Sequence, residues 1–254
     1  MIYEKPVKAL MHDFARERLK SGQVFSKAEP VQWFAERFPK IKRATVMIHV
    51  DAMSVNAANE RKHHRSVRPG SGHDLFFKLG KDQYRLWNRE GDPPPVYAET
   101  MLAGEPLDGT IDYEAQGEDG VEPVTQREFA FEKDLRNYLS KNLHLIEPGL
   151  QLYEDEGVSG LEYPAGGRFI DILAVDKGGH YVVVELKVSR GYERTIGQIL
   201  RYMGWIRQNL SAGEPVRGVI VASSISDDLK IAASLVADLS LAEYELSLTI
   251  RQAN

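Results

Sequence analysis

The sequence predicts a two-domain protein that mixes helices with strands, of the α/β or α+β class. Its 254 residues are enough for two domains, and an apolar content of 43% can support packed cores. An acidic, Pro-rich stretch over 88–126 separates two segments with different patterns. We therefore expect an N-terminal domain over 1–88, a linker over 89–126 and a C-terminal domain over 127–254.

The net charge of −5 conceals a strong asymmetry along the chain. Residues 1–87 hold 17 Lys/Arg against 9 Asp/Glu, whereas residues 88–126 hold 1 against 10. A basic head favours a polyanionic partner such as DNA over a merely solvated surface. The acidic linker either keeps itself extended by self-repulsion or masks the basic surface when DNA is absent.

Composition also excludes several classes of protein. The chain has no cysteine, so disulfides and thiolate metal sites are excluded. The first residues, MIYEKPVKALMHDF, lack the apolar segment of a signal peptide, and no apolar run reaches the length of a membrane span. We expect a cytoplasmic protein with no membrane partner. Its remaining metal ligands are His, Asp and Glu, of which the carboxylates suit hard cations.

Three helices and a hairpin are predicted before the linker. Apolar residues recur at helical spacing over 7–20, over 27–38 with Ser26 as the N-cap, and over 41–59. Residues 74–87, DLFFKLGKDQYRLW, read as two short strands about a Gly-Lys-Asp turn. Helices followed by a hairpin are the order of a winged helix, which is a helix-turn-helix with a β wing.

A basic stretch lies between the third helix and this hairpin. Basic side chains there suit contacts with DNA phosphates, with His63 and His64 as helpers. Taken alone, the stretch is equally typical of a solvated loop, but the helices and hairpin around it favour DNA contact. The predicted DNA-binding residues are Arg61, Lys62, Arg65 and Arg68.

The C-terminal segment alternates helices and strands. The pattern indicates a helix over 127–141, a strand or turn over 143–153, a hairpin over 168–187, a helix over 192–209, a strand over 216–222, a helix over 226–237 and a strand over 242–250. This order implies a mixed sheet flanked by helices.

The hairpin over 168–187 carries charges among its apolar residues. In 182-VVVELK-187, Glu185 and Lys187 share one face because strand side chains alternate. Asp171 lies near the start of the preceding strand, so pairing about the Lys177–His180 turn would bring it within reach of Glu185. The alternative is an exposed edge pair, but valines before Glu185 indicate burial on both faces.

Two carboxylates and a lysine suit phosphodiester hydrolysis. The carboxylates can hold Mg²⁺, which binds oxygen ligands, retains water and polarises a phosphate. Lys187 can stabilise the developing charge. We therefore expect Mg²⁺ as the cofactor, with Mn²⁺ as a substitute.

The spacing Asp171-x13-Glu185-x-Lys187 resembles that of the PD-(D/E)xK nuclease superfamily. The segments over 128–153, 168–187, 197–206 and 217–228 together resemble the catalytic domain of NucS-type endonucleases. The resemblance implies a restriction-endonuclease-like fold and a Mg²⁺-dependent endodeoxyribonuclease, which is a phosphodiester hydrolase acting in DNA repair or in restriction and defence. Residues 1–87 instead resemble winged-helix modules attached to restriction or defence nucleases.

The resemblance also implies roles for individual residues. Asp171 and Glu185 would be metal ligands, with Glu132 as an additional acidic ligand, and Lys187 the catalytic lysine. Gln198 and Tyr202 match a Q-x3-Y motif that positions water or DNA phosphate. The basic residue before the first catalytic strand, which would contact DNA, corresponds to Arg168.

Other functions fit the same residues. The chain could be a non-catalytic DNA-binding protein that retains a nuclease-like fold, or a scaffold in which the charges are structural. A homodimer would supply the two sites needed to cut both DNA strands.

Overall fold

A computed structural model describes residues 3–98, 126–187, 193–211 and 213–246. The chain divides into two compact units. Unit 1 comprises Met1–Pro123 together with Glu154–Ser159, and unit 2 comprises Val124–Tyr153 and Gly160–Asn254. The mixture of helices and strands predicted from the sequence is confirmed. In the described part of the chain, no helix has the length and apolar character needed to cross a membrane.

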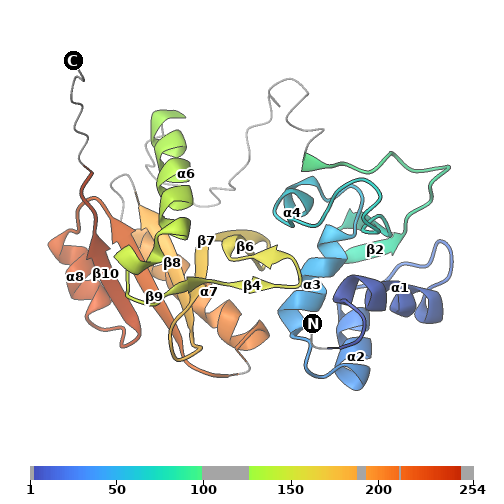
Figure 1. The fold of residues 1–254 in the computed structure, drawn as a ribbon, viewed down its shortest axis with the longest axis horizontal. Coiled ribbons are helices and arrows are strands. Elements are labelled where there is room, and N and C mark those ends of the chain that lie inside the picture. The colour runs from blue at the N-terminus through green and yellow to red at the C-terminus, as the bar shows by residue number, and fades with distance from the viewer. Residues whose placement is uncertain (1–2, 99–125, 188–192, 212, 247–254) are drawn as a thin grey trace, which may run out of the picture. The chain divides into compact units, whose positions relative to one another are not determined.

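Unit 1 has the predicted order of helices followed by a hairpin (Figure 1). Its elements are α1 (Val7–Arg18), α2 (Ala28–Arg37), α3 (Arg43–Ala52), α4 (Ala58–Lys62), β1 (Phe76–Gly80) and β2 (Gln83–Leu86). Phe25 exchanges two backbone hydrogen bonds with Tyr84 of β2, at 2.8 and 2.9 Å, and so extends the wing by a single residue.

An aromatic cluster forms the core of unit 1. Phe14 packs edge-on against Phe25 and Trp33, and Phe25 packs edge-on against Phe76, so the cluster joins α1, α2 and the hairpin. Such edge-to-face contacts add to the free energy gained by burying the rings. The cluster therefore holds the hairpin against α1 and α2.

Several predicted boundaries in unit 1 need correction. The third helix does not run over 41–59, because α3 ends at Ala52 and the short α4 follows after a turn. Ser26 does not cap α2 with its side chain; the N-cap position is Lys27, without a side-chain bond. The first part of the expected linker packs on unit 1, since Asp92 pairs with Arg85 and the Val96 amide donates to the Val55 carbonyl. The rest of the expected linker, 99–125, lies outside the described residues.

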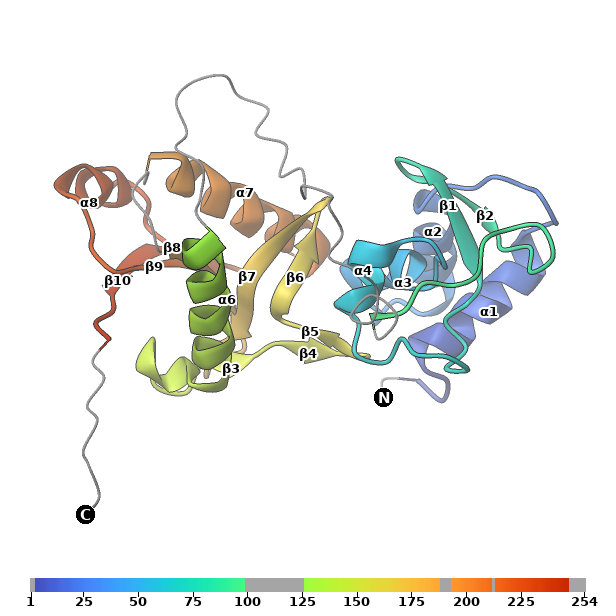
Figure 2. The same ribbon diagram turned by 90° about the horizontal axis from the view of Figure 1, so that it is seen from above.

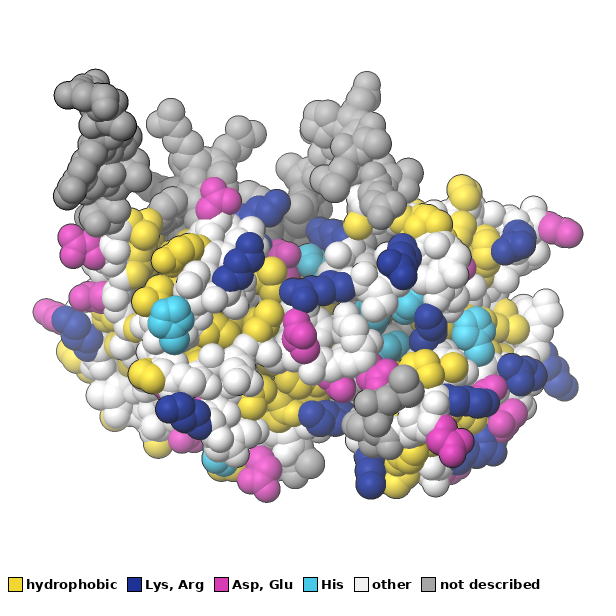
Figure 3. Space-filling model, viewed as in Figure 1, with side chains coloured by type: hydrophobic (Ala, Val, Ile, Leu, Met, Phe, Trp, Pro, Cys, Tyr) yellow, Lys and Arg dark blue, Asp and Glu magenta, His cyan; other side chains and the backbone are white. Residues whose placement is uncertain are grey.

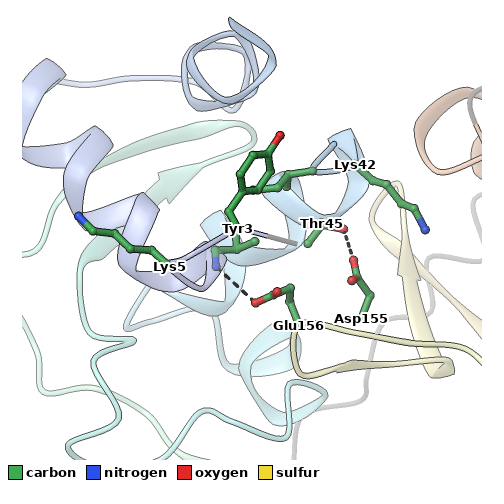
Figure 4. A pocket seen from close by; sticks show the side chains of 8 residues that line it. Tyr3, Lys5, Lys42, Thr45, Asp155 and Glu156 are labelled. Carbon is green, nitrogen blue, oxygen red and sulfur yellow. Dashed lines mark hydrogen bonds between the residues drawn. The ribbon is translucent and has the colours of Figure 1, made fainter. Parts of the chain in front are cut away.

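Unit 1 also includes a small acidic hairpin from later in the chain, formed by β4 (Glu154–Asp155) and β5 (Val158–Ser159). The Asp155 carboxylate accepts a hydrogen bond of 2.7 Å from the Thr45 hydroxyl of α3 (Figure 4). Glu156 accepts one from the amide of Val7, which begins α1. Since α1 has no side-chain cap of its own, Glu156 supplies a negative charge at a helix N-terminus.

Unit 2 is a mixed sheet with helices on both faces. Its elements are α6 (Gln126–Lys141), the 3-10 turn η1 (Leu143–Leu145), β3 (Gln151–Leu152), β6 (Leu161–Ala165), β7 (Arg168–Val175), β8 (Tyr181–Lys187), α7 (Glu193–Asn209), β9 (Val216–Ala222), α8 (Asp227–Ala233) and β10 (Leu239–Glu243). The strand order is β10-β9-β8-β7-β3, with β6 also paired to β7. In the view from above, α6 and α7 lie on opposite faces of this sheet (Figure 2).

The alternating side chains of β8 explain this layering. Val182, Val184 and Leu186 share one face with Leu135 and Leu139 of α6 in a common core cluster. The other face carries Glu185 and Lys187. The last strand begins earlier than expected, at Leu239 and not at residue 242, and three short strands occupy 154–165, where none was predicted.

Candidate active site

The hairpin of β7 and β8 fixes the register of the charged residues. Ile172 pairs with Val184 and Val175 with Tyr181, so continuation of the register places Asp171 opposite Glu185. Residues directly opposite each other in an antiparallel pair point to the same face. The predicted approach of these two carboxylates is therefore what the structure contains.

The turn between these strands is held by Asp176. Its Oδ1 accepts hydrogen bonds from the amides of Gly178 and His180, at 2.8 and 3.0 Å. Gly179 has φ +85, a conformation that glycine adopts without steric cost. The Gly-Gly pair thus closes a tight turn, and the tight turn sets the register that aligns the carboxylates.

Hydrogen bonds hold Glu185 from one side. Its Oε1 accepts from Lys187 Nζ at 2.9 Å and from the side-chain nitrogen of Gln198 at 2.5 Å. Its Oε2 is buried and has no hydrogen-bond partner. Because an unpaired buried carboxylate oxygen is costly, this atom is suited to ligate a cation.

Asp171 lies beside Glu185 but has different partners. The backbone amide of Leu186 donates to Oδ2 at 2.9 Å, and Arg136 Nη1 donates to Oδ1 at 3.1 Å. Arg136 comes from α6, whereas Gln198 comes from α7. Helices from opposite faces of the sheet therefore contribute to one cluster.

Two acidic side chains of the cluster, Glu185 and Glu132, have raised pKa values. Burial, with the nearby Asp171 charge, raises the pKa of Glu185. The same two causes raise the pKa of Glu132 on α6, which is half-buried. Although burial opposes it, the Glu185 carboxylate raises the pKa of Lys187, so that this amine stays charged. Raised carboxylate pKa values beside a partnered lysine are typical of catalytic clusters.

The donor set fits a hard divalent cation. Carboxylate oxygens of Asp171 and Glu185, with Glu132 nearby, match the ligand preference of Mg²⁺, and the unpartnered Oε2 of Glu185 supplies a ready ligand atom. Over the described residues, no three His, Asp or Glu side chains converge into a complete metal-binding group. Full coordination would therefore need water or a substrate oxygen in addition.

Tyr202 on α7 contacts this cluster through its hydroxyl group. It is buried, and its hydroxyl donates to the Phe169 carbonyl of β7 at 2.8 Å, while Gln198 approaches the same hydroxyl at 3.5 Å. Tyr202 thus joins α7 to β7 and is not exposed. Arg168, at the start of β7, is exposed as a DNA contact requires.

The predicted DNA-binding residues of unit 1 fall into two groups. Lys62, Arg65 and Arg68 are exposed, and Arg65 pairs with Glu154 of the acidic hairpin. Arg61 is only 2% exposed and pairs with Asp74, so its assignment as a DNA contact is wrong. On the face drawn in Figure 3, basic side chains are scattered among acidic and apolar ones.

The helix in the recognition position of unit 1 is also enclosed. Within α3 only Arg43 is exposed, and His49 on this helix stacks edge-on against the buried His64. The prediction that His64 assists in contacting DNA phosphates is therefore wrong, because its ring is buried. Base reading by α3 is not available in this arrangement, which leaves the exposed Lys62, Arg65 and Arg68 as the candidate nucleic-acid surface.

Sequence reasoning missed two residues at the cluster, Arg136 and Glu162. Arg136 follows Glu132 by four positions on α6, so helical spacing alone placed it on the same face. Glu162 lies in a Gly-rich acidic segment without periodicity, and nothing in the sequence marked it.

Comparisons with known proteins find a different match for each half of the chain. Residues 131–247 match the family described as Endonuclease NucS C-terminal domain, and residues 6–86 match a domain of unknown function, DUF7669. The chain is 32% identical over 113 residues to Endonuclease NucS of Methanopyrus kandleri, covering 44% of this chain and 39% of that protein. It is 30% identical over 152 residues to Endonuclease NucS of Frankia alni, covering 56% and 66%.

A solved structure described as a repair endonuclease from Pyrococcus abyssi shares 28% identity, with a TM-score of 0.37, and covers 51% of this chain and 50% of that one. The chain thus spans about half of that protein and 39% of the length of the Methanopyrus relative. The similarity to NucS-type endonucleases and their PD-(D/E)xK-like fold lies in unit 2, as predicted.

Proposed function

We propose that this protein, whose second unit is similar to the NucS C-terminal domain, is a metal-dependent DNA endonuclease. The observation that carries the proposal is the Glu185 carboxylate. One of its oxygens is held by Lys187 and Gln198, while the other is buried without a partner beside Asp171. Such a group is oriented for a ligand that the protein itself does not supply.

Asp171 and Glu185 would hold the cation, with Glu132 nearby as an additional acidic group and water or substrate oxygens completing the coordination. Mg²⁺ is the expected metal and Mn²⁺ a substitute. When bound, the cation would make a water molecule more acidic and neutralise charge on the scissile phosphate. Lys187 is charged and close to Glu185, so it can stabilise negative charge that develops on the phosphate. Gln198 and Tyr202 hold Glu185 and β7 in position.

Unit 1 would hold the duplex by its phosphates. The exposed Lys62, Arg65 and Arg68 give sequence-independent attraction, and Arg168 of unit 2 adds a charge at the start of β7. Because α3 is enclosed, we expect discrimination between DNA structures and not readout of a long base sequence. A role in DNA repair or in restriction and defence, and a homodimer that cuts both strands, remain part of this proposal.

A cleavage screen tests the proposal. Purified protein would be incubated with duplex, single-stranded, flapped, mismatched and methylated DNA, each with Mg²⁺, with Mn²⁺ or with EDTA. We expect at least one substrate to be cut in the presence of metal and none in EDTA. Absence of cleavage on every substrate, with the protein shown to be folded, would reject the endonuclease.

A second candidate is a non-catalytic DNA-binding protein, and one observation favours it. Both oxygens of Asp171 already have protein partners, and one partner is a guanidinium. A site that keeps an arginine where a metal is expected could have lost catalysis. DNA binding that is equally tight with EDTA and with Mg²⁺, without cleavage, would identify this alternative.

A further inference from the structure

Arg136 joins two carboxylates through the two arms of its guanidinium. Nη1 donates to Asp171 Oδ1 at 3.1 Å, and Nη2 donates to Glu162 Oε1 at 2.8 Å. The arginine is 9% exposed, and its Nε is buried without a hydrogen-bond partner. Because an arginine cannot be deprotonated in a protein, a permanent positive charge lies against the Asp171 carboxylate.

The backbone at Glu162 is shaped for this contact. Strand β6 pairs with β7 at Leu161↔Ile172 and at Tyr163↔Ile170, so Glu162 is the intervening residue opposite Asp171. Its φ is +48, in the left-handed region that is costly for glutamate. Such outliers persist where the surrounding structure holds them, and they cluster at functional sites.

Arg136 also offsets the repulsion between the Glu162 and Asp171 carboxylates. Two carboxylates directly opposite each other on paired strands repel, and Arg136 lies between Glu162 and Asp171 as their shared partner. Around the candidate metal position, the negative groups Glu132, Asp171 and Glu185 are thus balanced in part by Arg136 and Lys187. A divalent cation that approaches Asp171 meets a positive charge on one side and the Glu185 carboxylate on the other.

We propose that Arg136 is a positioning residue that fixes the Asp171 carboxylate and, through its charge, limits how tightly the site binds a divalent cation, with Glu162 holding Arg136 in place. This inference rests on the proposed function, because it assigns the cluster to a metal. It requires opposite effects from two substitutions. Arg136→Gln removes a positive charge from the site, whereas Glu162→Gln removes a negative one.

Titration of metal-free protein with Mn²⁺ alone, followed by calorimetry, tests these effects without DNA. We expect Arg136→Gln to bind Mn²⁺ about tenfold more tightly than the wild type, and Glu162→Gln to bind it several-fold more weakly. Circular dichroism establishes that each variant is folded. If both variants bind Mn²⁺ more weakly, or both bind it as the wild type does, the two residues are merely structural and the inference is overturned.

Arg217 provides a matched control. It also bridges two carboxylates, donating to Glu147 at 2.9 and 3.0 Å and to Asp176 at 2.9 Å. Asp176 lies five residues beyond Asp171, about 17 Å along an extended strand. Arg217→Gln should lower the melting temperature but leave Mn²⁺ affinity unchanged. A Mn²⁺ affinity that shifts in Arg217→Gln as much as in Arg136→Gln would show that the effect is not local to the cluster, which would overturn the inference.

Cleavage adds a second readout. With Asp171 Oδ1 released, Arg136→Gln should have a kcat at least about tenfold lower at saturating metal, although half-maximal activity needs less metal. The KM for DNA should stay unchanged. A kcat equal to that of the wild type would refute the positioning role. If the wild type cuts no DNA, the proposed function fails, but the Mn²⁺ titrations still decide whether Arg136 controls a metal site.

Discussion

The side-chain nitrogen of Gln198 on α7 lies 2.5 Å from Oε1 of Glu185 on β8. Among the described residues, Lys187 is the only other side chain that donates a hydrogen bond to Glu185. Two donors on Oε1 and none on Oε2 orient the carboxylate, so that its unpartnered oxygen is available to a cation. Helix α7 therefore contributes to the candidate site as well as to the core.

Loss of this contact should impair cleavage without unfolding the protein. In Gln198→Ala the Glu185 carboxylate keeps only Lys187 as its side-chain donor, and a misplacement of about 1 Å can reduce turnover about 100-fold. Single-turnover cleavage at saturating metal measures the effect. The control is Gln208→Ala, an exposed position on the same helix, which should cleave at the wild-type rate. Equal rates for both variants would remove Gln198 from the site.

Arg61 should be essential for stability. It donates to the carbonyls of Val96 and Ala52 and pairs with Asp74, all while buried. Arg61→Gln removes the cation paired with Asp74, which then keeps its hydrogen bond from the Tyr97 hydroxyl, and leaves these carbonyls without their charged donor. This loss should cost about 3–5 kcal/mol in the free energy of unfolding. Denaturant unfolding would measure this cost. The neighbouring Lys62→Gln is exposed and should change stability by less than about 0.5 kcal/mol. A cost for Arg61→Gln as small as that for Lys62→Gln would contradict this structural role.

Lys62 and Arg68 should instead act on DNA affinity. Each phosphate contact contributes about one unit to the slope of log affinity against log salt. Lys62→Gln and Arg68→Gln should each weaken binding to all duplexes and reduce that slope by about one, as measured by fluorescence anisotropy in EDTA. Lys141→Gln, an exposed lysine at the end of α6, should leave the slope unchanged. An unchanged slope in all three variants would place the DNA surface elsewhere.

Buried histidines should make the protein sensitive to acid. Burial lowers the pKa of His64 to about 3, and it also lowers the pKa of His73 to about 3. Unfolded histidine has a pKa of about 6.5, so the unfolded state takes up protons that the folded state refuses. The free energy of unfolding should therefore be highest above about pH 6.5 and should fall as the pH decreases toward 3. Each of the two histidines should contribute a loss of up to about 1.4 kcal/mol for each pH unit.

Thermal unfolding between pH 4 and 8 would measure this dependence. His64→Phe should flatten the curve, whereas the exposed His144→Phe should not alter it. If the wild type and His64→Phe lost stability in parallel, His64 would not be the group responsible.

The parts of the fold that could be predicted are those whose pattern follows from burial. Strand β9 coincides with the apolar run over 216–222, and the Gly-Gly turn fixed the register that joins Asp171 to Glu185. Both follow from local physics, since a buried strand must be apolar and a tight turn allows few registers.

The missed parts depend on tertiary contacts. A basic stretch in the sequence does not reveal that Arg61 turns inward to Asp74 while Lys62 stays outside. Glu162 acquires its role only because β6 places it opposite Asp171 with Arg136 between them. The acidic hairpin at 154–159 likewise carries no periodicity that would assign it to unit 1.

We propose that Asp171 and Lys187 belong to a metal-dependent nuclease site. Single-turnover cleavage of the best DNA substrate, with Mg²⁺ and after EDTA, tests it most directly in the wild type, Asp171→Asn, Lys187→Gln and the exposed control Glu214→Gln. We predict that EDTA abolishes cleavage, that each site variant loses at least about 100-fold in rate, and that the control retains the wild-type rate. Cleavage by Asp171→Asn or Lys187→Gln at the wild-type rate would contradict the account.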